Sequence, residues 1–170
     1  MAALNRVPIK PCNTASVRKR EGGATASQTW VRGAVLIAAS GRLSEGGTNP
    51  TEIVGVALHG VTSATADDVA QYVPTDNGQE FIASLDDSSD LGNGALAIAQ
   101  KYVKYGITED SSGIWYVDIN KTTDATVRVI VTELIDEVGD TSGRVRCRFI
   151  NGISDVGGTA VPLTIYAGTV

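Results

Sequence analysis

The chain has 170 residues, of which 42% are apolar and 19% charged, which fits one globular core and argues against a disordered or membrane-embedded chain. Its net charge of −5 hides two opposed segments: residues 1–32 carry a net +5, and residues 33–170 a net −10. With 19 glycines and many Val, Ile and Thr residues, the composition favours strands joined by tight turns, so we expect a mainly β fold.

The start of the chain is basic and lacks periodicity. We predict that residues 1–29 form an extended N-terminal arm and residues 30–170 a single β-rich domain. The arm contains prolines and a Gly-rich linker, so it is either a disordered tail without a role or a segment that becomes ordered along a partner. We expect a protein partner and no nucleic acid, because the acidic body repels polyanions. The candidate contact residues are Pro8, Lys10, Arg18, Lys19, Arg20 and Trp30.

Two further features of the sequence concern location and redox state. The segment 1–11 has no apolar run of signal-peptide or membrane-spanning length, so we expect neither export nor a membrane anchor. The two cysteines, Cys12 and Cys147, lie in different contexts, one in the arm and one in a predicted strand. We therefore interpret both as free thiols.

The first half of the body contains apolar strand candidates over 30–38 and 53–58, the second suited to burial on both faces. Asp76-Asn77-Gly78 is a tight-turn signal, and it predicts a hairpin between the preceding strand and one over 79–85. The apolar spacing over 95–103 predicts the one short helix. We expect the strands over 30–38 and 53–58 to lie in the core.

The second half of the body predicts paired strands. Strands over 104–108 and 114–119 flank one polar loop, and strands over 126–134 and 144–150 flank another. A last strand is predicted over 161–166. Seven or eight short strands with one short helix fit a compact β-barrel or sandwich.

One predicted strand alternates apolar side chains with guanidinium groups. Its inward residues are Val145, Cys147 and Phe149, and its outward residues are Arg144, Arg146 and Arg148. Three arginines on one face repel one another unless water or carboxylates compensate. This face is therefore either a solvated surface or a contact between subunits.

Side chains for catalysis or metal binding are scattered. His59 has no nucleophile elbow to serve, and we interpret it as structural. The carboxylates of 86–92 lack EF-hand spacing, so a solvated loop is favoured and a metal ion stays open. Gly92-Asn93-Gly94 could present amides to an anion, but the dinucleotide fingerprint is incomplete, and we interpret it as a helix start. The acid pairs 67–68 and 109–110 are common in acidic proteins. We predict no enzyme and no cofactor.

The order of several motifs along the body can be compared with that in known protein families. They are Gly33-Ala34-Val35-Leu36-Ile37, the segment 50–57, Tyr105-Gly106-Ile107 with Trp115-Tyr116-Val117-Asp118, and the segment 139–145 with Arg148-Phe149. Over about two thirds of the chain, this order resembles the head-decoration (cement) proteins of tailed bacteriophages.

The resemblance implies a small β-barrel or β-tulip-like body that sits on the outside of an icosahedral capsid as a homotrimer. It also implies synthesis in the host cytoplasm, no cofactor, and an arm that reaches across neighbouring subunits of the major capsid protein. Such multivalent attachment cross-links the shell against internal DNA pressure. A second hypothesis is a carbohydrate- or receptor-binding β module of a phage tail or surface structure. Its sugar-stacking rings would be Trp30, Trp115, Tyr102 and Tyr105.

Overall fold

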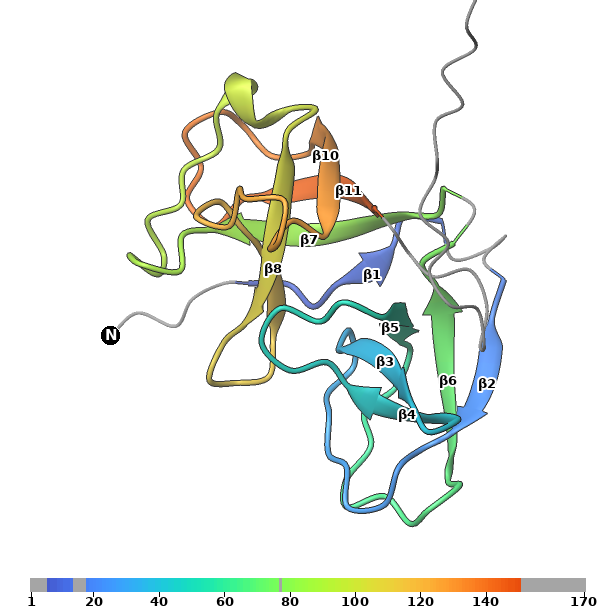
Figure 1. Cartoon of the computed structure of the whole chain (residues 1–170). Helices are drawn as coiled ribbons and strands as arrows, with labels where there is room; N and C mark the ends of the chain where they lie inside the picture. Colours follow the sequence, from blue (N-terminus) through green and yellow to red (C-terminus); the bar gives the residue numbers. More distant parts are fainter. Residues whose placement is uncertain (1–5, 14–17, 77, 151–170) are drawn as a thin grey trace, which may run out of the picture.

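The computed structural model describes residues 6–13, 18–76 and 78–150. In these ranges the fold is mainly β, with eleven strands and one turn of 3-10 helix (Figure 1). The elements are β1 (Lys10–Pro11), β2 (Arg20–Gly23), β3 (Val35–Ala39), β4 (Arg42–Glu45), β5 (Ile53–Ala57), β6 (Val69–Pro74), β7 (Glu80–Asp86), η1 (Ile98–Gln100), β8 (Lys104–Glu109), β9 (Trp115–Asp118), β10 (Val129–Leu134) and β11 (Arg144–Phe149). The predicted mainly β fold is confirmed.

Five strands form a closed barrel in the order β7-β11-β10-β8-β9. Neighbours in this ring are antiparallel except at the closure, where β7 and β9 pair in parallel and Asp86 lies beside Asp118. β1 adds to β7 from outside the ring, with Lys10 opposite Ile82. Closure satisfies the backbone groups that an open edge would expose, so the barrel is a small β-barrel of the predicted kind.

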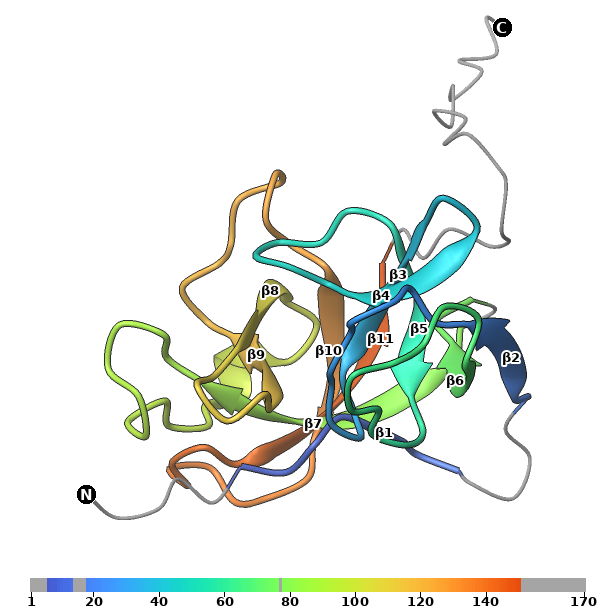
Figure 2. The same ribbon diagram turned by 90° about the horizontal axis from the view of Figure 1, so that it is seen from below.

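The other five strands form a second sheet in the order β2-β6-β5-β3-β4. Its two outer strands approach each other through a parallel bridge between Ala24 and Leu43. Figure 2 shows this sheet beside the barrel, with β6 leading into β7. One cluster of buried apolar side chains contains residues of both sheets, among them Val73 of β6 and Trp115 of β9. The two sheets therefore share one core.

The strand pairs predicted for the second half are confirmed. β8 pairs with β9 and β10 pairs with β11, both antiparallel. In β11, Val145, Cys147 and Phe149 are at most 8% exposed, as the alternation predicted. Cys12 and Cys147 are both free thiols, and burial raises the pKa of Cys147 to about 12. The strand predicted over 161–166 lies outside the described residues.

Two elements of the first half differ from prediction. The turn at 76–78 does not close a hairpin, because β6 and β7 belong to different sheets. The Asn-Gly signal depends on local backbone angles, which Gly78 adopts with φ of 70°, and it does not decide which strands pair. The strand expected over 30–38 begins only at Val35, since Gly33 takes a φ of 88°.

The predicted helix over 95–103 is reduced to the single turn η1. A stable α-helix needs an apolar face that can be buried. Leu96 is buried at 2% exposure, but Ile98 is 75% exposed and Tyr102 is 68% exposed. Tyr102 also has a φ of 67°, which no α-helix accommodates. Within the described ranges, the structure contains no helix with the length and apolar character to cross a membrane.

The described part of the expected arm is built into the sheets. β1 pairs with β7, and β2 pairs with β6 from Arg20 opposite Tyr72 onward. Ile9 is buried at 2% exposure. Short strands at a sheet edge are held by backbone hydrogen bonds, so they need no apolar period of their own. Residue 29 therefore marks no structural boundary between this segment and the body.

Gly33 lies directly against the N-terminal segment at Pro8 and Ile9. A Cβ at Gly33 would lie 2.7 Å from Pro8 Cβ and 2.8 Å from the carbonyl oxygen of Ile9. We expect Gly33→Ala to lower the free energy of unfolding by more than the ~1–2 kcal/mol that a left-handed φ costs. Urea denaturation followed by tryptophan fluorescence measures this loss. The matched control is Gly41→Ala, with a φ of 79° and no atom within 4 Å. Equal losses in both variants would contradict the packing argument.

Candidate binding surface

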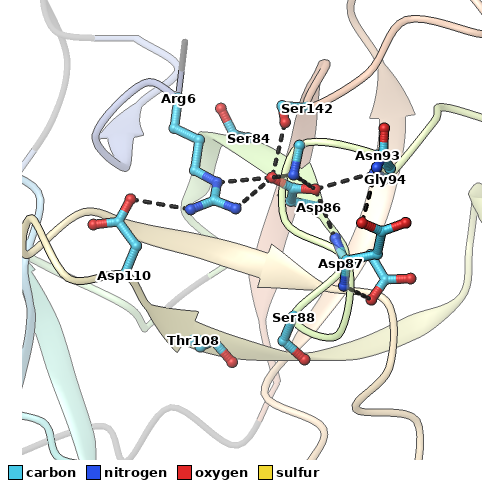
Figure 3. Close-up of polar contacts among 12 residues, drawn as sticks. Arg6, Ser84, Asp86, Asp87, Ser88, Asn93, Gly94, Thr108, Asp110 and Ser142 are labelled. Atoms are coloured by element: carbon cyan, nitrogen blue, oxygen red, sulfur yellow. Dashed lines mark hydrogen bonds and ion pairs between the residues drawn. The ribbon is translucent and has the colours of Figure 1, made fainter. Parts of the chain in front are cut away.

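A buried ion pair fixes the start of the described chain to the barrel (Figure 3). Arg6 donates a hydrogen bond from Nε to Asp86 at 2.8 Å, and its Nη1 lies 3.1 Å from a carboxylate oxygen of Asp110. The side chains of Arg6 and Asp86 are 1% and 0% exposed. The guanidinium also lies over the ring of Tyr116, 4.1 Å from its centroid. Because a buried charge is costly without its partner, this geometry fixes Arg6 in one place.

Further donors surround the Asp86 carboxylate. Ser142 Oγ donates at 2.8 Å, and the backbone N–H groups of Gly92 and Gly94 each donate at 3.1 Å. A Cβ at Gly94 would lie 2.5 Å from Asp86 Cα, so only glycine allows this approach. The prediction of a helix start at 92–94 is wrong. Two of its amides do bind an anion, and that anion is the protein's own carboxylate.

We term Arg6, Asp86 and the donors around this carboxylate the anchor. Their contacts determine the charge states of its residues. Burial alone would raise the pKa of Asp86, but hydrogen bonds from a backbone N–H, Ser142 and Arg6 outweigh it, and the pKa is lowered. Burial, together with the charge of Asp118, raises the pKa of Tyr116 to about 12. At neutral pH, Asp86 is therefore an anion and Tyr116 a neutral ring beneath the guanidinium.

The acidic loop considered for a metal ion uses its carboxylates internally. Asp86 belongs to the ion pair, and Asp87 accepts two hydrogen bonds from Ser89, each of 2.7 Å. Asp90 accepts one from Asn93 at 2.8 Å. Across the part of the chain that the structure describes, no group of three His, Cys, Asp or Glu side chains could hold a metal ion. Hydrogen bonds within the protein therefore account for this clustering.

The acid pairs considered for a glycosidase are also engaged elsewhere. Asp67 accepts two hydrogen bonds from Arg42, each of 2.8 Å. Glu109 shares a hydrogen bond with Glu45 of β4, whereas the neighbouring Asp110 faces the N-terminal guanidinium. Burial raises the pKa of both Glu45 and Glu109. The two members of the 109–110 pair thus serve different contacts.

The aromatic residues proposed for sugar stacking are mostly in the core. Trp30 is 3% exposed, Trp115 1% and Tyr105 7%, whereas Tyr102 is 68% exposed. The Trp30 indole N–H donates to the carbonyl oxygen of His59 at 3.2 Å. Trp30, predicted to contact a partner, is thus an internal anchor. His59 contributes a backbone acceptor, consistent with its structural interpretation.

The fold brings together cations that lie far apart in the sequence. Lys10 of β1 is opposite Ile82 of β7, and Ile82 is opposite Arg146 of β11. Residues directly opposite in an antiparallel pair point to the same face, so Lys10 and Arg146 share the outer face of this sheet. We term this surface the basic face, and it comprises Lys10, Arg144, Arg146 and Arg148.

Carboxylates neutralise only part of the basic face. Arg144 pairs with Asp136 at 2.6 Å, and Arg146 pairs with a carboxylate of β10 at 2.9 Å. These partners relieve the repulsion expected between neighbouring arginines. Lys10 and Arg148 are both exposed, and neither forms an ion pair with a residue of the described ranges. Glu80 of β7 lies opposite Arg148 on this face and is 3.8 Å from Arg146, so the face carries one acidic residue and offers two exposed cations that lie outside ion pairs.

The remaining cations of the expected arm lie at the adjacent edge of this face. Arg20 pairs with Asp76 at 3.4 Å, in the turn between β6 and β7. In the same turn, a Cβ at Gly78 would lie 3.9 Å from Arg148 Nη1, so Arg20 and Arg148 flank this turn. The exposed residues directly before Arg20 are Arg18 and Lys19.

The anchor that positions this face was missed in the sequence. Arg6 counted as one of several arm charges, and Asp86 as one of several loop carboxylates. Ser84 and Asp86 share one face of β7 with Glu80 and alternate with apolar residues, as solvent-facing positions also do. Both are fully buried, and Ser84 Oγ accepts a hydrogen bond from the backbone N–H of Val7 at 3.0 Å. The structure, and not this alternation, shows that the N-terminal segment covers both side chains.

Comparison with known proteins leaves the assignment to the structure. No protein-family model matches the chain, and a search of curated proteins found no match. The features of the molecule that bear on function are therefore the basic face and the anchor that holds it.

Replacing Arg6 tests the anchor. Arg6→Met leaves the buried carboxylate of Asp86 without its cation, so we expect a loss of about 3–5 kcal/mol in the free energy of unfolding. The matched control is Arg42→Met, which breaks an exposed pair with Asp67 and should change stability little. Chemical denaturation of both variants measures the difference. Similar small losses would show that the buried pair does not hold the N-terminal segment.

The lowered pKa of Asp86 predicts a pH dependence. A carboxyl group whose pKa is depressed by folding contributes stability above its unfolded pKa of about 3.9 and loses it as the pH falls through the folded value. We expect the urea midpoint of the wild type to fall on acidification below about pH 4. Asp86→Asn should be less stable at neutral pH and show a shallower fall. Parallel curves for the two proteins would exclude Asp86 as the titrating group.

Proposed function

We propose that this protein decorates the outside of an assembled phage head and stabilises it by binding subunits of the major capsid protein through the basic face. One observation carries the proposal: Lys10 and Arg148 are exposed on one sheet face, and neither forms an ion pair within the described ranges. The resemblance of the sequence to head-decoration proteins supplies the target. The same resemblance supports a homotrimer on the capsid exterior.

The rigidity of the basic face supports a binding role. Lys10 belongs to β1, which the β7 ladder holds on one side and the Arg6 ion pair holds close by. A charge on a fixed strand loses little conformational freedom when it binds, so more of the interaction energy remains as affinity. In this proposal the contact is made by a structured sheet face. Of the expected arm, Arg18, Lys19 and Arg20 at the edge of this face extend the contact.

The charge distribution supports a defined orientation on the shell. Residues 33–170 carry a net charge of −10, whereas the basic face gathers four cations on one side. An acidic capsid surface would attract this face and repel the rest of the body. Contacts of several copies with one lattice would then add avidity and oppose separation of the capsid subunits.

Charge reversal tests the proposed contact better than truncation. Deleting residues 1–28 would remove Arg6 and two strands, and so would mix folding with binding. The sharper comparison is Arg148→Glu with Arg32→Glu, which makes the same charge change at an exposed position outside the basic face. The assay is co-sedimentation with shells assembled from a phage major capsid protein.

We expect wild type and Arg32→Glu to bind these shells, and Arg148→Glu and Lys10→Glu to bind about tenfold more weakly or not at all, with binding that weakens in high salt. Equal binding by all four proteins would remove the basic face from the mechanism. Failure of the wild type to bind would contradict the decoration function itself.

A further inference from the structure

Large apolar side chains are exposed in an uneven distribution. Six are exposed in the described ranges, and three of these lie on two neighbouring loops, 95–104 and 135–143. Ile98 is 75% exposed, Tyr102 68% and Val138 59%. Scattered exposed apolar residues need no explanation, but a concentration at one place marks an interaction surface.

Backbone contacts hold the two loops side by side. Leu96 N donates to the carbonyl oxygen of Asp140 at 2.9 Å, and Gly139 N donates to the carbonyl oxygen of Leu96 at 2.8 Å. An antiparallel bridge joins Ala95 to Thr141. Ile98 begins η1 shortly after this bridge, and Val138 directly precedes Gly139, so both exposed side chains lie next to the contact between the two loops. Both loops lie at the end of the barrel beyond β10, at the top of Figure 1.

The local backbone turns these side chains outward. Leu96 is buried at 2% exposure and anchors the inner side of its loop, whereas η1 buries none of its residues. Tyr102 has a φ of 67°, an uncommon and costly conformation for a bulky residue. A hydrogen bond of 2.7 Å from its N–H to the carbonyl oxygen of Val131 holds it there. The fold thus maintains an exposed ring at an energetic cost.

The charges of the two loops are opposite and separate. Loop 95–104 carries Lys101 and Lys104 and no acidic residue, and both lysines are exposed. Loop 135–143 carries Asp136, Glu137 and Asp140 and no basic residue. Asp136 is paired with an arginine of β11, which leaves Glu137 and Asp140 as its exposed charges.

We propose that this pair of loops is a self-association surface and that its occupant is a second copy of this chain. A closed symmetric assembly brings the basic loop of one copy against the acidic loop of the next, while Ile98, Tyr102 and Val138 are buried between them. The charge complementarity within one patch selects a second copy over a partner of single charge. The inference rests on the homo-oligomer of the proposed function and locates its subunit interface. Its test uses the protein alone, whereas capsid binding is tested separately by co-sedimentation.

The first test compares two exposed apolar residues. Sedimentation equilibrium of the full chain up to about 100 μM, where an interface of micromolar affinity is populated, should give an oligomeric mass for the wild type. Ile98→Asp should give the monomer mass. Val69→Asp changes a side chain that is 70% exposed on the other sheet, and should leave the oligomer unchanged. Circular dichroism confirms that both variants fold.

The second test exchanges charges across the surface. Lys101→Glu and Glu137→Lys should each dissociate the oligomer, and the double variant should restore it, because the loops become complementary again. Since Lys101 also lies over the Tyr102 ring at 5.1 Å, Lys101→Gln controls for loss of that contact without charge reversal. A monomeric wild type at every concentration, or equal masses for wild type and Ile98→Asp, would overturn the proposal.

Discussion

The buried ion pair between Arg6 and Asp86 lies at the strand on which most of the barrel depends. β7 pairs with β11, closes the ring with β9, and receives β1. Asp86 stands at the end of β7, directly where β9 joins. Removing a carboxylate from water costs several kcal/mol, so this junction needs a cation and several donors at the same point. Arg6 supplies the cation, and the loop amides supply most of the donors.

Burial separates the charges of this protein into two roles. Arg6 and Asp86 are fully enclosed, and their pairing determines where the N-terminal segment lies. On the sheet outside, pairs such as Arg144 with Asp136 are screened by water and contribute little to stability. These pairs do determine which cations are available to a partner. They neutralise Arg144 and Arg146, whereas Lys10 and Arg148 form no ion pair within the described ranges. The same residue types thus fix the fold in one place and define a surface in another.

The sequence predicts features that depend on neighbouring residues and misses those that depend on distant ones. The alternation of β11 has a period of two, which is local, so both the strand and its orientation followed from it. The turn at 76–78 was recognised, but its strands belong to different sheets. The spacing over 95–103 indicated an apolar helix face, yet in this stretch Leu96 is buried, Val103 is partly buried against the core, and Ile98 and Tyr102 are exposed. The pairing of Arg6 leaves no local pattern, since its partner lies 80 residues away.

That separation sets an order of events during synthesis. A ribosome that adds about 5–20 residues per second makes Arg6 several seconds before Asp86, 80 residues later. Asp110 follows 104 residues after Arg6, and Ser142, which completes the donors around the carboxylate, comes later still. Arg6 therefore remains hydrated while the strands that will enclose it are translated. The donors around Asp86 are complete only once Ser142 has been made, so the barrel reaches its final form after nearly all of the described chain has been translated.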